Sequence, residues 1–252
     1  MYEINQDDFP DDFRQAWCDA GSHINQQGQE GVKWLRSNLN MPIAEHLSFL
    51  LGNQLVFVFV EINSVPFSGS AKNLFINAAL EASAIPCVLT MKKKVGGFEP
   101  VFYGWGFKHA LTDLPINPTD LISNEDVEMS DWELHDFAIK TVCSQLEKEG
   151  HTIYSSQSSL HINPSIWFQD KHQLNWVIVR AVRYPNKTAP PPINLDDMKK
   201  HYAKVSENGY FASVSVANGN DPFDPMAEKF GNFLPLIRGG PLFVSFSGLE
   251  SL

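Results

Sequence analysis

The spacing of apolar residues changes along the chain, and it predicts where helices and strands lie. Residues 54–62 are apolar at nearly every position, which is typical of a strand covered on both faces. A helix is expected at 70–84, followed by strands at 85–91 and 99–103. Three consecutive lysines at 92–94 fit either an exposed hairpin tip between these strands or a phosphate-binding segment.

The pattern ahead of this first strand predicts irregular to helical structure. A short helix is expected at 31–39, with its larger apolar residues on one side. A second helix is expected at 43–51, because Pro42 suits a first helical turn and Gly52 suits a helix end.

The clearest helix of the chain is predicted to begin at Ser130. Ser130 and Glu133 have the spacing of a capping box, in which each side chain satisfies a backbone amide of the other residue. Gly150 suits the position that closes the helix. One face of the helix is marked by apolar residues and a threonine at helical spacing, namely Leu134, Phe137, Ala138, Thr141, Val142 and Leu146.

The elements predicted after this helix are three strands, a helix and a further strand. Residues 174–182 are expected to be the central strand, because the segment Trp176–Val179 is apolar on both faces. The second helix begins near Asn194 or Asp196, either of which can cap it. A final strand is expected at 242–246. The other three strands are expected at 151–157, 165–169 and 210–216.

The chain is predicted to contain two α/β halves. Pro115, Pro118 and a run of acidic residues mark a connector at 111–130. It separates an acidic N-terminal half, residues 1–110, from a second half, residues 131–252. The second half has the order helix–strand–strand–strand–helix–strand.

Charge is unevenly distributed over the 252 residues, whose formal net charge is −10. Residues 1–150 contain 21 acidic and 10 basic residues (−11), whereas residues 151–252 contain 8 acidic and 9 basic residues (+1). An acidic protein repels nucleic acid phosphates at long range, so the net charge disfavours a nucleic acid partner. We therefore expect a protein partner or self-association.

The sequence predicts a cytoplasmic protein with no membrane partner. Its longest apolar run, residues 55–60, is far shorter than the ~20 residues of a spanning helix. The acidic start of the chain lacks the pattern of a secretory signal. The three cysteines, Cys18, Cys87 and Cys143, are far apart and fit free thiols in a reducing compartment.

The element order over residues 131–217 resembles the core of the PD-(D/E)XK nuclease superfamily, the restriction-endonuclease-like fold. Two local features add to the resemblance: Lys148-Glu149-Gly150 leads straight into a strand, and Pro164 precedes the second strand. The resemblance implies that a helix Glu, a strand Asp and a strand Glu bind magnesium. A Lys two positions beyond the strand Glu would help to activate water.

The positions that match this pattern lack its chemistry. Glu133 matches the helix Glu, but Ser165 stands where the Asp is expected, Ile178 where the Glu is expected and Arg180 where the Lys is expected. Asp170, at the end of the second strand, is the nearest substitute for the missing Asp. No residue is therefore assigned a catalytic or metal-binding role, and the candidates are Glu133, Asp170 and Arg180. Glu133 has a structural alternative as a helix cap, and Arg180 is expected to pair with Glu133 or Asp170.

Three functions fit these observations. The first is a non-catalytic binding or regulatory module on a degenerate nuclease-like fold, without a cofactor. The second is a divergent magnesium-dependent nuclease that uses Glu133 and Asp170. The third is a small-molecule binding protein with a pocket between the two halves.

Overall fold

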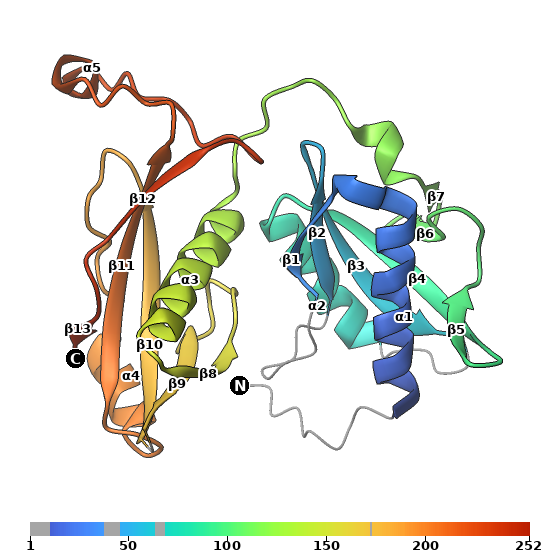
Figure 1. Ribbon diagram of the computed structural model, residues 1–252, viewed down its shortest axis with the longest axis horizontal. Helices are drawn as coiled ribbons and strands as arrows, with labels where there is room; N and C mark the ends of the chain where they lie inside the picture. Colours follow the sequence, from blue (N-terminus) through green and yellow to red (C-terminus); the bar gives the residue numbers. More distant parts are fainter. Residues whose placement is uncertain (1–10, 38–45, 64–68, 172) are drawn as a thin grey trace. The chain divides into compact units, whose positions relative to one another are not determined.

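A computed structural model describes residues 11–37, 46–63, 69–171 and 173–252 of the chain. The chain divides into two units, Met1–Val127 and Glu128–Leu252 (Figure 1). Each unit combines helices with a mixed sheet, so the predicted mixed α/β class with two halves is confirmed.

The first unit contains a seven-stranded sheet and the helices α1 and α2. Strands β3 and β4 are parallel, and the other neighbouring pairs are antiparallel. The helices are α1 (Asp11–Gly28) and α2 (Gly69–Glu81). The strands follow the order β1 (Val32–Arg36), β2 (Leu47–Leu51), β3 (Gln54–Ile62), β4 (Ile85–Lys94), β6 (Phe107–His109) and β7 (Pro115–Ile116), with β5 (Gly97–Pro100) also paired to β4.

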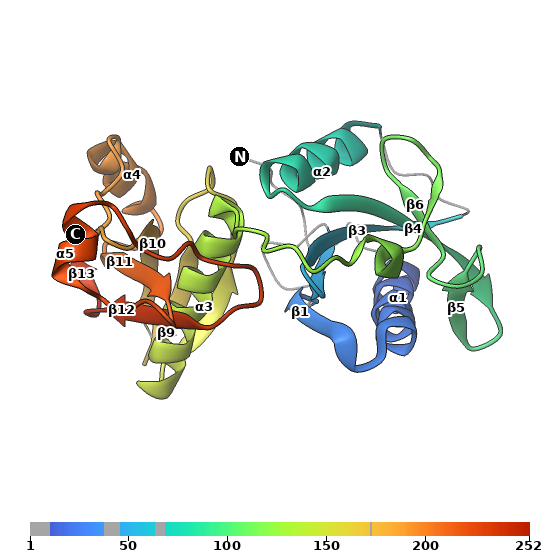
Figure 2. The ribbon, with the colours of Figure 1, turned by 90° about the horizontal axis from the view of Figure 1, so that it is seen from above.

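Helices α1 and α2 cover opposite faces of this sheet (Figure 2). The valines of β3 join a core with α1, while Phe59 of the same strand contacts Phe75 of α2, with ring centroids 5.3 Å apart. The uninterrupted apolar sequence of β3 follows from this arrangement, because both of its faces are buried.

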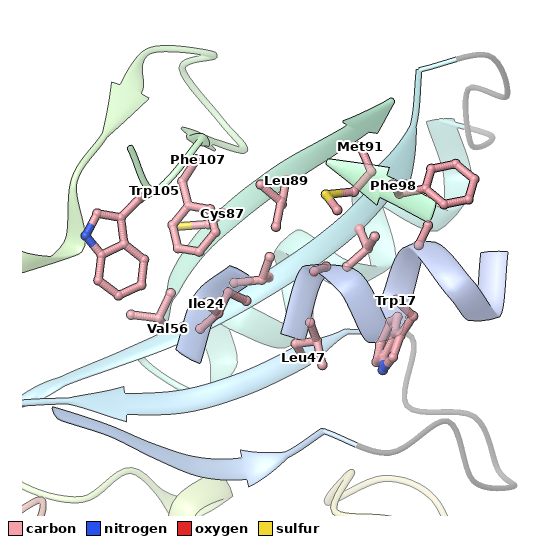
Figure 3. Close-up of a cluster of buried hydrophobic side chains, with 14 of the residues drawn as sticks. Trp17, Ile24, Leu47, Val56, Cys87, Leu89, Met91, Phe98, Trp105 and Phe107 are labelled. Carbon is pink, nitrogen blue, oxygen red and sulfur yellow. The ribbon is translucent and has the colours of Figure 1, made fainter. Parts of the chain in front are cut away.

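The core between α1 and the sheet is built from large side chains of many elements (Figure 3). Trp17 and Ile24 of α1 are buried against strand residues. Among the strand and loop residues of this core are Leu47, Val56, Cys87, Leu89, Met91, Phe98, Trp105 and Phe107. Burial raises the pKa of Cys87, so this thiol remains protonated.

The helices predicted at 31–39 and 43–51 are wrong for their described parts. Val32–Arg36 and Leu47–Leu51 form the antiparallel strands β1 and β2, and β2 also pairs with β3. Short apolar segments of this length do not distinguish a helix from a strand, and here pairing with β3 decides the outcome. Residues 38–45, including the expected helix start at Pro42, lie outside the described part of the chain.

The three lysines at 92–94 lie at the exposed end of the hairpin between β4 and β5. Lys93 Nζ lies 2.8 Å from Asp12 Oδ2, and the Nζ atoms of Lys92 and Lys94 lie 3.3 and 3.6 Å from the carboxylate of Glu99. Two carboxylates therefore offset part of the charge of these three lysines, which favours the hairpin tip over a phosphate-binding segment.

The second unit contains one six-stranded sheet and has the predicted element order. Strands β10 and β11 are parallel, and the other neighbouring pairs are antiparallel. The strand order is β12-β11-β10-β9-β8, and β13 also pairs with β11. The elements are α3 (Asp131–Lys148), β8 (Thr152–Ser156), β9 (Ile166–Asp170), β10 (Gln173–Arg183), α4 (Leu195–Tyr202), β11 (Gly209–Asn218), α5 (Pro225–Lys229), β12 (Leu242–Phe246) and β13 (Glu250–Ser251).

The central strand β10 sends alternate side chains to two different cores. Val177 and Val179 join the core that contains the apolar face of α3. Trp176 and Ile178 join a smaller core with Phe211 and residues of α4. The expected central strand is therefore buried on both faces, as its apolar sequence predicts.

The boundary between the units lies after Val127, within the predicted connector at 111–130. Most of that connector belongs to the first unit, because β7 pairs with β6 and Asn53 Nδ2 donates to Ser123 Oγ at 2.9 Å.

Among the described residues, no helix is long and apolar enough to cross a membrane.

The stability of the first unit is expected to depend on His23 below neutral pH. His23 Nε2 lies 3.2 Å from the Trp105 carbonyl oxygen, and burial lowers the pKa of His23 below its ordinary value. The unfolded chain takes up a proton near pH ~6.5, where the folded chain resists it. Stability is therefore present above that pH and is lost as the pH falls through the lowered pKa.

This prediction is checked by urea unfolding of the wild type and of His23→Gln between pH 8 and 5, a range that spans the ordinary pKa of about 6.5. Glutamine keeps an N–H for the Trp105 carbonyl and removes the titration. The variant should lose less stability than the wild type at the acidic end. Parallel curves would show that His23 does not contribute.

Candidate functional site

Glu133 lies in the first turn of α3 and its carboxylate is bound by two partners. It completes the capping box, since Ser130 N donates to Glu133 Oε2 at 2.9 Å and Glu133 N donates to Ser130 Oγ at 3.3 Å. Arg238 Nε donates to Glu133 Oε1 at 2.8 Å, and Arg238 Nη2 donates to Oε2 at 2.7 Å. Both side chains are only 3% exposed, so this is a buried two-pronged ion pair.

The nuclease resemblance expects magnesium at the Glu133 carboxylate, and in the structure Arg238 binds this group. Each oxygen of Glu133 already accepts a hydrogen bond from Arg238, and Oε2 also accepts from Ser130. A magnesium ion at this carboxylate would have to displace the Arg238 guanidinium and leave it buried without its acid. The arrangement supports the structural role of Glu133 as a helix cap.

Arg238 is the residue of this site that sequence reasoning missed. It lies 105 positions from Glu133 in a Gly-rich turn, and no local pattern marks it. Backbone pairing brings it there: Met129 N donates to Leu236 O at 2.8 Å, and Glu128 forms a bridge with Ile237. The start of α3 and the turn before β12 are thereby held together.

Asp170 lies at the other end of α3. Its Oδ1 atom is 3.5 Å from Nδ1 of His151, which comes just after the helix, and its side chain is 47% exposed. Lys148, the last residue of α3, is fifteen positions beyond Glu133, a length of about 22 Å along the helix axis. Ligands of one magnesium ion lie about 2.1 Å from it, so Glu133 and Asp170 do not share a metal ion. The structure therefore separates Glu133 from Asp170, which the sequence analysis placed together in one magnesium site.

Ser165, Ile178 and Arg180 come together on neighbouring strand segments. Ser165 N donates to Val177 O at 2.9 Å, and Ser165 Oγ accepts from Val179 N at 3.2 Å. Ile178 is fully buried in the core beneath α4. The three positions where the resemblance expects an Asp, a Glu and a Lys therefore adjoin, and none of them carries a carboxylate.

Arg180 does not make the ion pair that the sequence predicted. Its Nη1 donates to Val179 O at 2.7 Å and its Nη2 donates to Asn163 Oδ1 at 3.1 Å, both neutral acceptors. The carbonyl oxygen of Asn163 accepts in turn from the Tyr202 hydroxyl. Burial lowers the pKa of Arg180. The predicted pairing with Glu133 or Asp170 is wrong, because Arg238 holds Glu133 and His151 contacts Asp170.

Among the described residues, no three His, Cys, Asp or Glu side chains gather closely enough to hold a metal ion. A pocket of about 110 Å³ lies in the second unit, lined in part by Arg183, Tyr184, Phe233 and Leu234. Ligand pockets are usually about 300–1,000 Å³, so this cavity is small for a metabolite.

Comparison with known proteins adds one similarity. Residues 132–252 match a domain of unknown function (DUF8840), which covers the second unit from the first turn of α3 onward. No curated protein and no solved structure matches the chain.

The Glu133–Arg238 pair is expected to be essential for the stability of the second unit. Removing one partner of a buried ion pair leaves the other charge uncompensated, at a cost of about 3–5 kcal/mol. Glu133→Gln and Arg238→Met should each lower the free energy of unfolding by about that amount. The double variant should lose less than the sum, because no buried charge remains. Urea unfolding of all four proteins measures this coupling, and strict additivity would contradict it.

Arg180→Met is the matched control for Arg238→Met. The same substitution at this position removes a guanidinium that contacts only neutral oxygens, so no buried carboxylate is left without a partner. We expect a smaller loss of unfolding free energy than for Arg238→Met in the same urea titration. An equal or larger loss would mean that Arg180 has a stabilising role beyond these two contacts.

Proposed function

We propose that the second unit is a non-catalytic binding module on a nuclease-like scaffold, and that its partner is a protein. The observation that carries the proposal is the structural role of Ser165, Ile178 and Arg180. Each stands where the resemblance expects a catalytic group, and each makes structural contacts with neighbouring backbone or core.

Metal-assisted cleavage of a phosphodiester needs hard oxygen ligands and a group that can move a proton. Ile178 offers no ligand atom, and Ser165 uses its hydroxyl oxygen to accept from Val179 N. Arg180 remains protonated near neutral pH and is a poor proton carrier. Glu133, the one matching carboxylate, is held by Arg238. These contacts support a scaffold role for all four residues.

The choice of a protein partner rests on charge. The net charge of −10, which residues 1–150 supply, opposes approach of the whole chain to the phosphates of nucleic acid, and Asp12 and Glu99 lie beside the three lysines at 92–94. The alternative of a nuclease that uses Glu133 with Asp170 loses its shared metal site, since the two lie near opposite ends of α3. The pocket between the two halves stays a prediction.

The purified chain is expected to leave plasmid DNA and single-stranded RNA intact in the presence of Mg²⁺ or Mn²⁺. The physical reason is that Ser165, Ile178 and Arg180 stand at the positions where the resemblance expects an Asp, a Glu and a Lys, and none of the three supplies a carboxylate. Gel electrophoresis after prolonged incubation measures this. The matched control is Arg180→Met, which separates cleavage by this site from a contaminant. Metal-dependent cleavage that Arg180→Met abolishes would overturn the proposal.

The nuclease-like scaffold has a separate test in a triple variant, Ser165→Asp, Ile178→Glu and Arg180→Lys. If the scaffold is a decayed nuclease, these side chains converge on a metal site, and Mn²⁺ should raise the melting temperature of the variant but not of the wild type. Circular dichroism first establishes that the variant folds, because Ile178→Glu buries a carboxylate. A folded variant without a metal-dependent shift would contradict the scaffold assignment and leave the non-catalytic proposal standing.

A further inference from the structure

Strand β12 is an edge of the sheet in the second unit. Its residues pair with β11 in an unbroken antiparallel register from Leu242 to Phe246. On its other side, no described segment of the chain pairs with it (Figure 1). A row of backbone N–H and C=O groups is therefore available along this edge.

Residues 242–246 of β12 contain no charge, proline or bulge, although Pro241 directly precedes the strand and Glu250 of β13 lies farther along the same edge. Edge strands usually carry a charged residue, a proline or a bulge that discourages pairing with another chain. Residues 242–246 are Leu-Phe-Val-Ser-Phe, and their register with β11 has no irregularity. Phe243 is 56% exposed and Val244 is 37% exposed.

Other edges of the two sheets provide an internal comparison. Strand β8, at the opposite edge of the same sheet, has a register shift between Ile153 and Ser155. In the first unit, β1 carries Lys33 and Arg36 and also has a register shift, and β7 is two residues long and begins with Pro115. Each of these edge strands carries a protective feature, whereas residues 242–246 of β12 carry none.

Aromatic side chains extend the apolar surface beyond β12. Phe243 contacts Phe223, with ring centroids 5.5 Å apart, and Tyr184 contacts Phe223 and Phe233 at 5.3 and 6.3 Å. Phe223 and Phe233 are each 40% exposed, although they touch other rings. We call Phe223, Phe233, Leu234, Phe243 and Val244 the β12 patch; Phe243 and Val244 are consecutive in the strand and reach its edge from opposite faces of the sheet.

We propose that two copies of this chain pair through β12, antiparallel about a two-fold axis at Val244. This register places Phe243 opposite Ser245 of the second copy, so a large side chain meets a small one beside the axis. Leu242 lies opposite Phe246, one position farther out. The strand has no charge, so self-pairing brings no like charges together. A two-fold interface of this kind uses the same surface on both copies.

The available area suits a reversible dimer. An aromatic side chain can bury about 150–250 Å², and the members of the β12 patch are roughly half exposed. The three phenylalanines, with Leu234, Val244 and the strand backbone, would bury at most roughly 500 Å² per copy, or about 1,000 Å² in total. That area lies at the lower limit of specific interfaces, so dimerisation should depend on concentration.

The test is sedimentation equilibrium of the full chain over a range of concentrations. The wild type should show a mass that rises from one chain to two. Val244→Lys should remain a single chain, because it places two lysines opposite each other at the axis. The matched control is Val205→Lys, which makes the same change at a residue 65% exposed and outside the patch. It should behave as the wild type.

A cross-linking experiment tests the register independently of that variant's folding. In a Cys18→Ser background, which removes the exposed native thiol, Val244→Cys should be joined to its own copy by a short bismaleimide. Residues directly opposite each other in an antiparallel pair have Cβ atoms about 5 Å apart. Val205→Cys in the same background should not cross-link. A wild type that stays a single chain up to about 100 µM, or a dimer that persists in Val244→Lys, would overturn the proposal.

Discussion

The ion pair between Glu133 and Arg238 is the interaction on which the second unit depends. It joins the first turn of α3 to the turn that precedes β12, and it does so with both charges withdrawn from water. Desolvating a carboxylate and a guanidinium is costly unless their geometry is good, and here the two groups meet through two hydrogen bonds. The pair therefore fixes the position of α3 and of the segment leading into β12 together.

The same pair gives the Glu133 carboxylate a structural role. The helix cap and Arg238 share one carboxylate, so the group that could have held a metal ion is committed to the fold. On the other face of the sheet, Ser165 and Arg180 satisfy backbone and amide groups around the central strand. A hydroxyl at Ser165 and an apolar side chain at Ile178 thus stand where the resemblance expects carboxylate ligands.

Local sequence patterns were enough to predict the elements whose identity is decided locally. The capping box at Ser130, the helical spacing after it and the apolar run of β3 all appear in the structure as expected. The helices predicted at 31–39 and 43–51 are strands because short apolar segments fit both periods, and Gly52, which suits a helix end, instead lies in the turn of the β2–β3 hairpin. Arg238 could not be predicted for a different reason: its role is set by a residue 105 positions away.

The distance in sequence between Glu133 and Arg238 has a consequence for how the second unit forms. The first helix of the unit emerges from the ribosome long before the arginine that neutralises its buried acid. Until the C-terminal turn arrives, Glu133 must remain hydrated, which keeps the start of α3 at the surface. Closing this long loop brings the last strands and the first helix together in one late step, so the unit is expected to complete its fold only after synthesis of its C-terminal segment.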